Sequence, residues 1–378
     1  MSQRDPITAG AGESPRPGHN HRPRLFGAAI LLAGVFAGLF AGLPAMAGMA
    51  VASNVVAGED DSAVYGPRLE GFDYPHPVRA HAFESQRQHV EMIYMDVPPT
   101  GEANGQTALL LHGKNFCAAT WEQSITALAQ AGYRVIAPDQ VGFCKSSKPD
   151  GYQYALAGLA ANTRGLLAAL GIERSVVIGH SMGGMLAMRY SLMYPAAVEH
   201  LALIGPIGLE DWQAMGVPYQ PVEQVYASEL RTTYDSIRDY QVAVYYAGQW
   251  RPEFERWARM QAGMYAGPGR EVVAWHQALT FDMLMAQPVV YELPLLRVPA
   301  TLFIGVHDRT ALGRGAAPPE VQARLGDYRA LGRRTAQAIP GAVLVEYEDL
   351  GHSPHIQDPD RFHRDLLRAL ARADETSD

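Results

Sequence analysis

Between Val176 and Ala187, a β-branched apolar run changes into a helix-like stretch through the sequence GHSMG at positions 179–183. This pattern predicts a strand, a sharp corner and a helix that ends before Pro195. Glycines around the corner remove side chains that would clash, while Ser181 is held in strained backbone and projected outward. The pattern alone is weak evidence for a catalytic serine, because a tight turn with a surface serine has the same sequence pattern.

Short apolar runs along the chain predict buried strands, and helical lengths such as Ala155 to Leu170 separate most of them. Strands that alternate with helices and are buried on both faces indicate a mainly parallel sheet between helical layers. The predicted strands are Val90 to Val97, Thr107 to Leu111, Arg134 to Pro138, Ser175 to Ile178, Leu201 to Ile204, Ala300 to Ile304 and Val343 to Tyr347.

The interval 207–296 does not follow this alternation of strands and helices. It shows no clear buried strand, has helix-compatible runs, and contains eight tyrosines and four of the five tryptophans. We interpret it as an inserted helical cap. For any one of its aromatic residues, simple packing within the insert is the alternative interpretation, because aromatic side chains mostly serve as core.

A serine hydroxyl is a poor nucleophile at neutral pH, so Ser181 needs a base within hydrogen-bond reach and an acid that orients this base. His352 follows the last predicted strand and Asp308 follows the strand before it. Both lie at strand carboxyl ends, where ligands and reactions gather in open α/β sheets. The chain order Ser181, Asp308, His352 favours a catalytic triad. Asp211, after the run ending at Ile204, stays open as an alternative acid.

Acyl transfer also needs backbone donors aimed at the oxyanion. We predict that the N–H groups of Met182, just after the serine, and of Lys114, in the loop after Leu111, form this oxyanion hole. Two interpretations of the Lys114 side chain remain: it binds an acidic acyl group, or it extends its ammonium into solvent while the backbone acts. We favour the second.

No metal and no cofactor are expected. His307, Asp308, His352 and His355 lack H-E-x-x-H or a comparable ligand spacing, and we interpret His307 and His355 as loop residues or residues behind the triad. The formal net charge is −8, and no run of Lys and Arg is of the kind that follows a phosphate backbone, so nucleic acid is not an expected partner.

The N-terminal residues 1–47 are typical of a signal peptide: arginines, an apolar stretch from Leu25 to Leu43, and small residues at Ala45-Met46-Ala47. We therefore expect export, to the periplasm or the medium, with no stable membrane association after cleavage. An uncleaved membrane anchor is the alternative, because this apolar stretch is long enough to span a bilayer. Residues 48–75 are polar and aperiodic and are predicted as a linker or flexible arm.

Four motifs carry a resemblance to a known family: HGKNFCAATW ending at Trp121, DQVGFCKS beginning at Asp139, GHSMGG around Ser181, and GVHD with GHSPH near the end. From about Phe83 to Ala371 the chain resembles the α/β-hydrolase superfamily, and most of all its capped members. These include esterases, perhydrolases, C–C hydrolases, haloalkane dehalogenases and epoxide hydrolases. The last two place Asp where this chain has Ser181, which argues against both chemistries.

The resemblance implies an eight-stranded, mostly parallel sheet flanked by helices, with core segments 76–206 and 297–372 and the cap 207–296 inserted after the sixth strand. Two residues depart from the family pattern, Lys114 after His-Gly and Cys144 at a position where glycine is common. In the resembled fold the loops of Cys117 and Cys144 follow neighbouring strands, so a disulfide is conceivable in an oxidising compartment. Two buried free thiols are the alternative.

The combined reading predicts a serine hydrolase that cleaves a small or medium carboxylic ester through an acyl-enzyme. Its partner would be a small-molecule ester, and the oligomeric state is not indicated. Two alternatives remain: hydrolysis of a C–C bond or amide by the same triad, and a non-catalytic binding protein of this fold.

Overall fold

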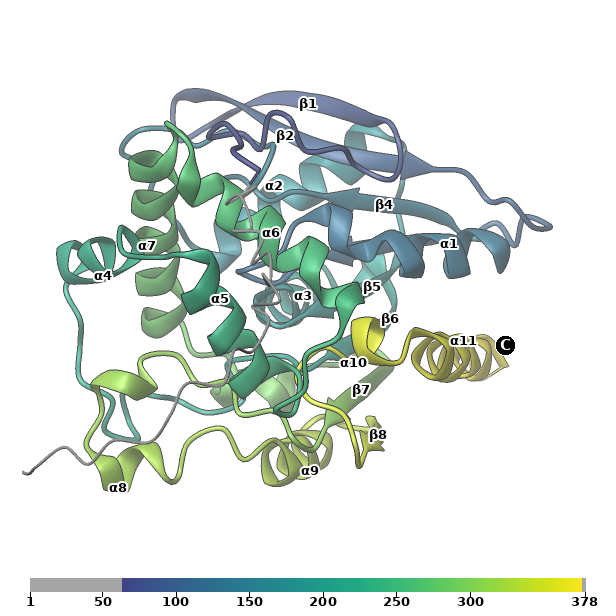
Figure 1. The fold of residues 1–378 in the computed structure, drawn as a ribbon. Helices are drawn as coiled ribbons and strands as arrows, with labels where there is room; N and C mark the ends of the chain where they lie inside the picture. The colour runs from purple at the N-terminus through teal and green to yellow at the C-terminus, as the bar shows by residue number, and fades with distance from the viewer. Residues whose placement is uncertain (1–62, 376–378) are drawn as a thin grey trace, which may run out of the picture. The chain divides into compact units, whose positions relative to one another are not determined.

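Eight strands form one sheet in the computed structural model, which describes residues 63–375 (Figure 1). The strand order is β1-β2-β4-β3-β5-β6-β7-β8. The β1/β2 and β2/β4 pairs are antiparallel, and all other pairs are parallel. The mostly parallel, eight-stranded sheet is therefore confirmed. The strands are β1 (Val78–Ser85), β2 (Gln88–Val97), β3 (Thr107–Leu111), β4 (Arg134–Pro138), β5 (Ser175–His180), β6 (Val198–Ile204), β7 (Ala300–Gly305) and β8 (Val343–Tyr347).

Alternate residues of the central strands face opposite layers, because side chains along a strand point to opposite faces. Leu109 of β3 packs in the core that contains α2 (Leu156–Ala169), α3 (Met182–Met193) and α9 (Tyr328–Ala338). Leu110, the next residue, packs in the core that contains α1 (Glu122–Gln130) and α11 (Pro359–Glu375). Helices thus cover both faces, which explains why these strands appear as continuous apolar runs.

The chain between β6 and β7 forms helices and no strand, as the interval 207–296 predicted. The helices are α4 (Val222–Glu229), α5 (Tyr234–Tyr240), α6 (Pro252–Ala266) and α7 (Arg270–Ala286), with a π-helical turn over Gln241–Tyr245. Figure 1 shows these helices grouped together. We call residues 207–296 the cap. Two short helices, α8 (Pro319–Gln322) and α10 (Pro354–Gln357), lie in loops that follow β7 and β8.

Residues 63–75, the described part of the predicted linker, pack against the rest of the chain. The Tyr65 N–H donates to the Gly263 carbonyl in α6 at 3.0 Å, and both Leu69 and Phe72 are buried. These apolar side chains lie among polar ones, and their burial favours a fixed position over a flexible arm.

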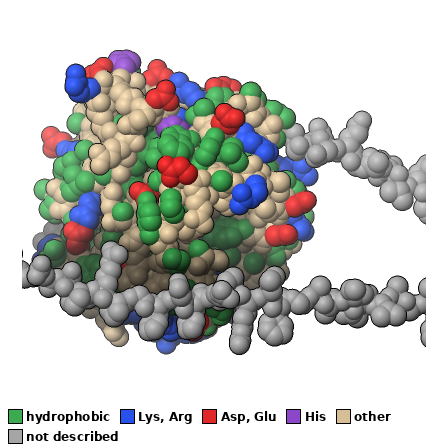
Figure 2. Space-filling view, turned by 90° about the vertical axis from the view of Figure 1, so that its left-hand side faces the viewer, with side chains coloured by type: hydrophobic (Ala, Val, Ile, Leu, Met, Phe, Trp, Pro, Cys, Tyr) green, Lys and Arg blue, Asp and Glu red, His purple; other side chains and the backbone are tan. Residues whose placement is uncertain are grey.

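The predicted signal peptide and the start of the predicted linker lie outside the described residues. Among the helices of residues 63–375, none has the length and hydropathy needed to cross a bilayer. On the face shown in Figure 2, acidic and basic side chains of the described residues lie interspersed among apolar ones.

Candidate active site

Ser181 lies at the corner between β5 and α3, with backbone angles φ 57° and ψ −118°. A positive φ is strained for a residue with a side chain, and such strain gathers at functional sites. Close packing fixes the corner. A Cβ at Gly183 would lie 2.0 Å from the Leu111 carbonyl oxygen, and one at Gly179 would lie 2.2 Å from the Gly183 carbonyl oxygen. Both glycines are therefore required by backbone contacts.

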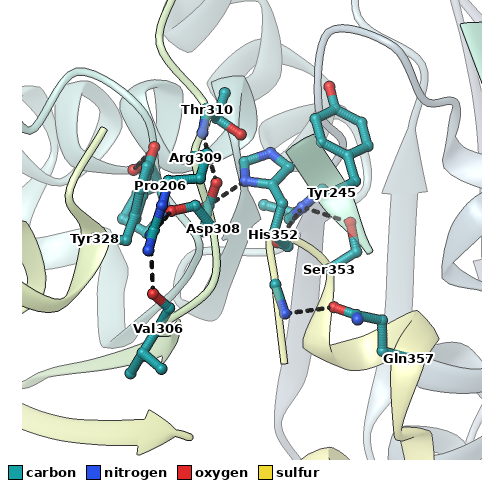
Figure 3. Close-up of polar contacts among 12 residues, drawn as sticks. Pro206, Tyr245, Val306, Asp308, Arg309, Thr310, Tyr328, His352, Ser353 and Gln357 are labelled. Carbon is teal, nitrogen blue, oxygen red and sulfur yellow. Dashed lines mark hydrogen bonds and ion pairs between the residues drawn. The ribbon is translucent and has the colours of Figure 1, made fainter. Parts of the chain in front are cut away.

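Asp308, in the loop after β7, and His352, in the loop after β8, point toward each other (Figure 3). His352 Nδ1 and Asp308 Oδ2 are 2.6 Å apart, and both side chains are fully buried. The second carboxylate oxygen, Asp308 Oδ1, accepts from the Thr310 N–H at 2.8 Å. With its two oxygens held, the carboxylate fixes the ring orientation of His352 and favours a proton on Nδ1.

The other ring nitrogen of His352, Nε2, is buried and has no hydrogen-bond partner among the described residues. Ser181 is close to this histidine through its neighbour His180, whose Nε2 lies 3.1 Å from the His352 carbonyl oxygen. The ring centroids of His180 and His352 are 4.8 Å apart. Hydrogen bonds between nucleophile and base are often long in ligand-free enzymes, so an Nε2 without a partner on this histidine fits a general base.

Asp211, the alternative acid, is engaged elsewhere. Its Oδ1 accepts from the Ala214 N–H at 3.0 Å and its Oδ2 from the Tyr291 hydroxyl at 2.9 Å. The structure thus brings Asp308, and not Asp211, to the histidine.

The loop after β3 lies directly against the serine corner. A Cβ at Gly113 would come within 3.1 Å of the Ser181 Cβ. His112 holds the loop, because its Nε2 accepts from the Gln140 N–H at 3.0 Å and its Nδ1 donates to the Gly113 carbonyl at 2.8 Å. Burial lowers the pKa of His112, consistent with this neutral tautomer. Helix α3 begins at Met182, so the Met182 N–H is one of the first-turn amides without an acceptor inside the helix.

The Lys114 side chain does not extend into solvent, and our favoured interpretation of it was wrong. Its Nζ donates to Gln277 Oε1 at 2.6 Å and forms an ion pair with Glu229 Oε1 at 3.3 Å, and only 13% of the side chain is exposed. The Tyr265 hydroxyl donates to Glu229 Oε2 at 2.6 Å. Cap residues therefore cover the ammonium and supply its partners. The sequence did not reveal them, because Glu229 and Gln277 are distant along the chain.

Cys117 and Cys144 form a disulfide, with their Cα atoms 5.9 Å apart. Asp139 lies close to both sulfurs and makes the group resemble a metal site. The disulfide leaves no thiolate to bind a metal, and Asp139 already accepts from the Ala118 N–H at 2.8 Å and the Tyr74 hydroxyl at 2.7 Å. The disulfide and Asp139 therefore connect the loops after β3 and β4.

His355, which we interpreted as a loop residue or a residue behind the triad, is buried next to His180, with ring centroids 4.5 Å apart. Burial, reinforced by neighbouring histidines, holds the pKa values of both rings well below the usual range. These two rings are therefore neutral at pH 7. His307, by contrast, is exposed.

A pocket of about 560 Å³ opens onto Ser181. Loop residues 309–315 line one side of it, and cap side chains such as Val244, Tyr245 and Phe281 line another. This volume lies within the ordinary range of small-molecule sites. The sequence singled out the cap for its aromatic content but did not single out Tyr245.

Three comparisons with known proteins agree with the fold. A family model described as alpha/beta hydrolase fold matches residues 108–278. The solved structure of a probable hydrolytic enzyme from Pseudomonas aeruginosa PAO1 is 61% identical, with a TM-score of 0.81, over 82% of this chain and 99% of that chain.

Two curated relatives match shorter stretches. A 2-hydroxy-6-oxo-6-phenylhexa-2,4-dienoate hydrolase of Comamonas testosteroni is 32% identical over 137 residues, 35% of this chain and 48% of the relative. Epoxide hydrolase A of Mycobacterium tuberculosis is 34% identical over 134 residues, 35% of this chain and 38% of the relative. The chain thus spans less than half the length of these curated relatives. The family rests on the match to the Pseudomonas structure, whose identity and coverage show that the chain belongs to the α/β-hydrolase superfamily.

Proposed function

We propose that this chain is a serine hydrolase that cleaves a small or medium carboxylic ester through an acyl-enzyme. The observation that carries the proposal is the fully buried pair of Asp308 Oδ2 and His352 Nδ1, 2.6 Å apart, together with a serine in strained backbone that lines a pocket. A buried carboxylate that orients an imidazole, whose second nitrogen is free, is the arrangement that activates a serine hydroxyl.

In the proposed reaction, Ser181 Oγ attacks the ester carbonyl while His352 Nε2 takes the hydroxyl proton. Asp308 stabilises the imidazolium that forms. The N–H groups of Met182 and Lys114 donate to the oxyanion of the tetrahedral intermediate. His352 then returns the proton to the leaving alcohol, and a water molecule activated by the same imidazole releases the acid from Ser181.

Hydrolysis of a C–C bond by the same residues is the second candidate. The similarity to a 2-hydroxy-6-oxo-6-phenylhexa-2,4-dienoate hydrolase favours it, because the compound in that name has no ester or amide bond, so that its hydrolysis breaks a C–C bond. Epoxide opening is disfavoured despite the similarity to epoxide hydrolase A, because the corner residue here is Ser181 and carries no carboxylate.

A fluorophosphonate probe tests for an activated serine, because it reacts quickly only with such a residue. We expect labelling of the wild type, abolished in Ser181→Ala. A panel of esters of graded acyl length, a vinylogous diketone and an aminoacyl amide then separates the reaction classes. Full ester hydrolysis by Ser181→Ala would refute the mechanism, and cleavage of the diketone alone would favour the C–C hydrolase.

Export is part of the proposal, supported by the sequence of residues 1–47. Mass spectrometry of protein secreted by a bacterial host checks it. A mature N-terminus just after Ala47 is expected, whereas a full-length chain in the membrane fraction would support the anchor.

A further inference from the structure

Tyr245, the last residue of the π-helical turn in the cap, lies against the His352 ring. The two ring centroids are 4.5 Å apart and the planes are inclined by 29°, which is a stacked arrangement. The Tyr245 carbonyl also accepts from the His352 N–H at 2.8 Å. Both the backbone and the ring of this cap residue are thus fixed to the histidine loop.

A second contact fixes the Tyr245 ring to the loop after β3. Asn115 Nδ2 donates to the Tyr245 hydroxyl oxygen at 2.9 Å. Asn115 directly follows Lys114, the proposed oxyanion donor. Packing is tight, because a Cβ at Gly351 would lie 2.2 Å from the Tyr245 carbonyl oxygen. Tyr245 therefore connects the loop of the oxyanion hole with the loop of the base, and π-helical turns are frequent at functional sites.

We propose that Tyr245 is a positioning residue for the reaction: its ring holds the His352 imidazole in place and stabilises the imidazolium that forms when Ser181 is deprotonated. The inference rests on the proposed function. An aromatic face attracts a cation, and the attraction is strongest where water is excluded. Tyr245 is 4% exposed and His352 is fully buried, so the stacked pair meets that condition.

None of the other described groups that we find around the imidazole presents an aromatic face to it as Tyr245 does. Asp308 approaches the ring edge at Nδ1. Burial holds the pKa values of His180 and His355 well below their usual range, so neither adds a charge at neutral pH. The Tyr328 ring meets His352 edge-on, with centroids 6.3 Å apart. Burial also raises the pKa of the Tyr245 phenol, which stays neutral.

The test compares Tyr245→Leu, which replaces the aromatic face by a smaller aliphatic side chain, with Tyr245→Phe, which keeps the face and loses the Asn115 contact. Without the face, the imidazolium is less stable. We expect Tyr245→Leu to move the acid limb of the kcat/KM profile about one unit toward lower pH and to lower the plateau about tenfold. Tyr245→Phe should keep the limb within about 0.3 units of the wild type.

One control, one fallback variant and a second readout make the result specific. Tyr219→Leu replaces an exposed cap tyrosine that does not line the pocket and should match the wild type. If Tyr245→Leu does not fold, as judged by circular dichroism, Tyr245→Met provides the same comparison, because methionine fills irregular space without an aromatic face. A second readout, the NMR titration midpoint of the His352 ring protons, does not depend on turnover and should move in the same direction.

The outcomes separate this inference from the proposed function. An unchanged acid limb and NMR midpoint in an active Tyr245→Leu protein would overturn the role of Tyr245 alone. Equal shifts in the Phe and Leu variants would also overturn it, because the aromatic face would then be irrelevant. A wild type that neither labels with fluorophosphonate nor cleaves any ester would refute the proposed function instead.

Discussion

The loops at the carboxyl edge of the sheet and the cap build the two sides of one pocket by different means. The sheet loops are fixed by buried contacts to backbone groups and by a covalent bond: Asp308 accepts from the Thr310 N–H within its own loop, Asp139 accepts from the Ala118 N–H of another loop, and a disulfide joins Cys117 to Cys144. The cap reaches the site largely through side chains, such as Glu229 on the Lys114 ammonium.

This difference suggests a division of labour. Catalysis needs groups held within a fraction of an ångström, which backbone contacts and buried pairs provide. Substrate selection needs a surface that can vary without disturbing those groups. Changes in the sheet loops should therefore lower turnover or stability, while changes in the cap away from Tyr245 should redistribute activity among substrates.

The strongest test of this comparison replaces each of the two candidate acids by asparagine in turn. Asp308→Asn should lower kcat by about 10³ to 10⁴, because an amide does not hold the imidazole in the required tautomer. Asp211→Asn is the matched change on the cap side and should stay within about threefold of the wild type, because the Asp211 carboxylate accepts hydrogen bonds from Ala214 and Tyr291 and not from the histidine. Ester hydrolysis rates measure both, and a larger loss in Asp211→Asn would reverse the assignment of the acid.

The disulfide is the covalent part of the sheet-loop side. Replacing both cysteines by serine should lower the free energy of unfolding by about 3 kcal/mol, because the bridge closes a loop with a sequence separation of 27 residues. Urea denaturation measures the loss. Mass spectrometry after alkylation without reductant provides the control, and labelling of both cysteines in wild-type protein would show that the bond is absent.

The sequence predicted the sheet side well because its signals are local. Thr107–Leu111, Arg134–Pro138 and Val343–Tyr347 are strands with the predicted bounds. Strand β1 was not among the predicted runs, because Val78–Ser85 is an edge strand with largely exposed residues and no apolar run. The loops that carry Ser181, Asp308 and His352 follow from strand ends, so their convergence could be predicted without knowing any contact.

The cap could be predicted only as a helical interval. Aromatic content does not tell which ring faces the site, and the stacking of Tyr245 on His352 depends on a π-helical turn with no distinct sequence signal. The partners of Lys114 lie 115 and 163 residues further along the chain. Hydrophobic periodicity describes the face that a helix buries, but such long-range polar pairs arise only when the whole chain is folded.

Lys148 also holds a sheet loop, because its ammonium donates to the Cys144 carbonyl at 2.7 Å. Unlike the other contacts of these loops, this one depends on pH, because burial lowers the pKa of Lys148 to about 7. The unfolded chain, with the ordinary lysine pKa, binds more protons between pH 7 and about 10.5. The free energy of unfolding should therefore rise with pH in this window, by at most about 1.4 kcal/mol per pH unit from this group. Lys148→Met should flatten the rise.

Urea denaturation at several pH values measures this dependence. Arg324→Met removes an exposed cation elsewhere and should leave the slope unchanged. A slope that persists in Lys148→Met would assign the pH dependence to other groups.

The smallest effect that we expect comes from a substitution in the cap, and it concerns the preference between two substrates. Glu229→Gln removes the carboxylate paired with Lys114 and leaves the Gln277 contact to the ammonium in place. The pocket then gains one net positive charge, so a carboxylate-bearing ester should improve relative to a neutral ester of the same length. We expect the ratio of their kcat/KM values to rise about fivefold, which corresponds to about 1 kcal/mol, while fluorophosphonate labelling of Ser181 stays at the wild-type rate.

Glu223→Gln, an exposed acid on the same helix α4, makes the same charge change outside the pocket and should leave the ratio unchanged. Slower labelling in Glu229→Gln at an unchanged ratio would mean that the ion pair serves the oxyanion loop and not substrate selection, and the proposed division between the two sides of the pocket would fail at Lys114.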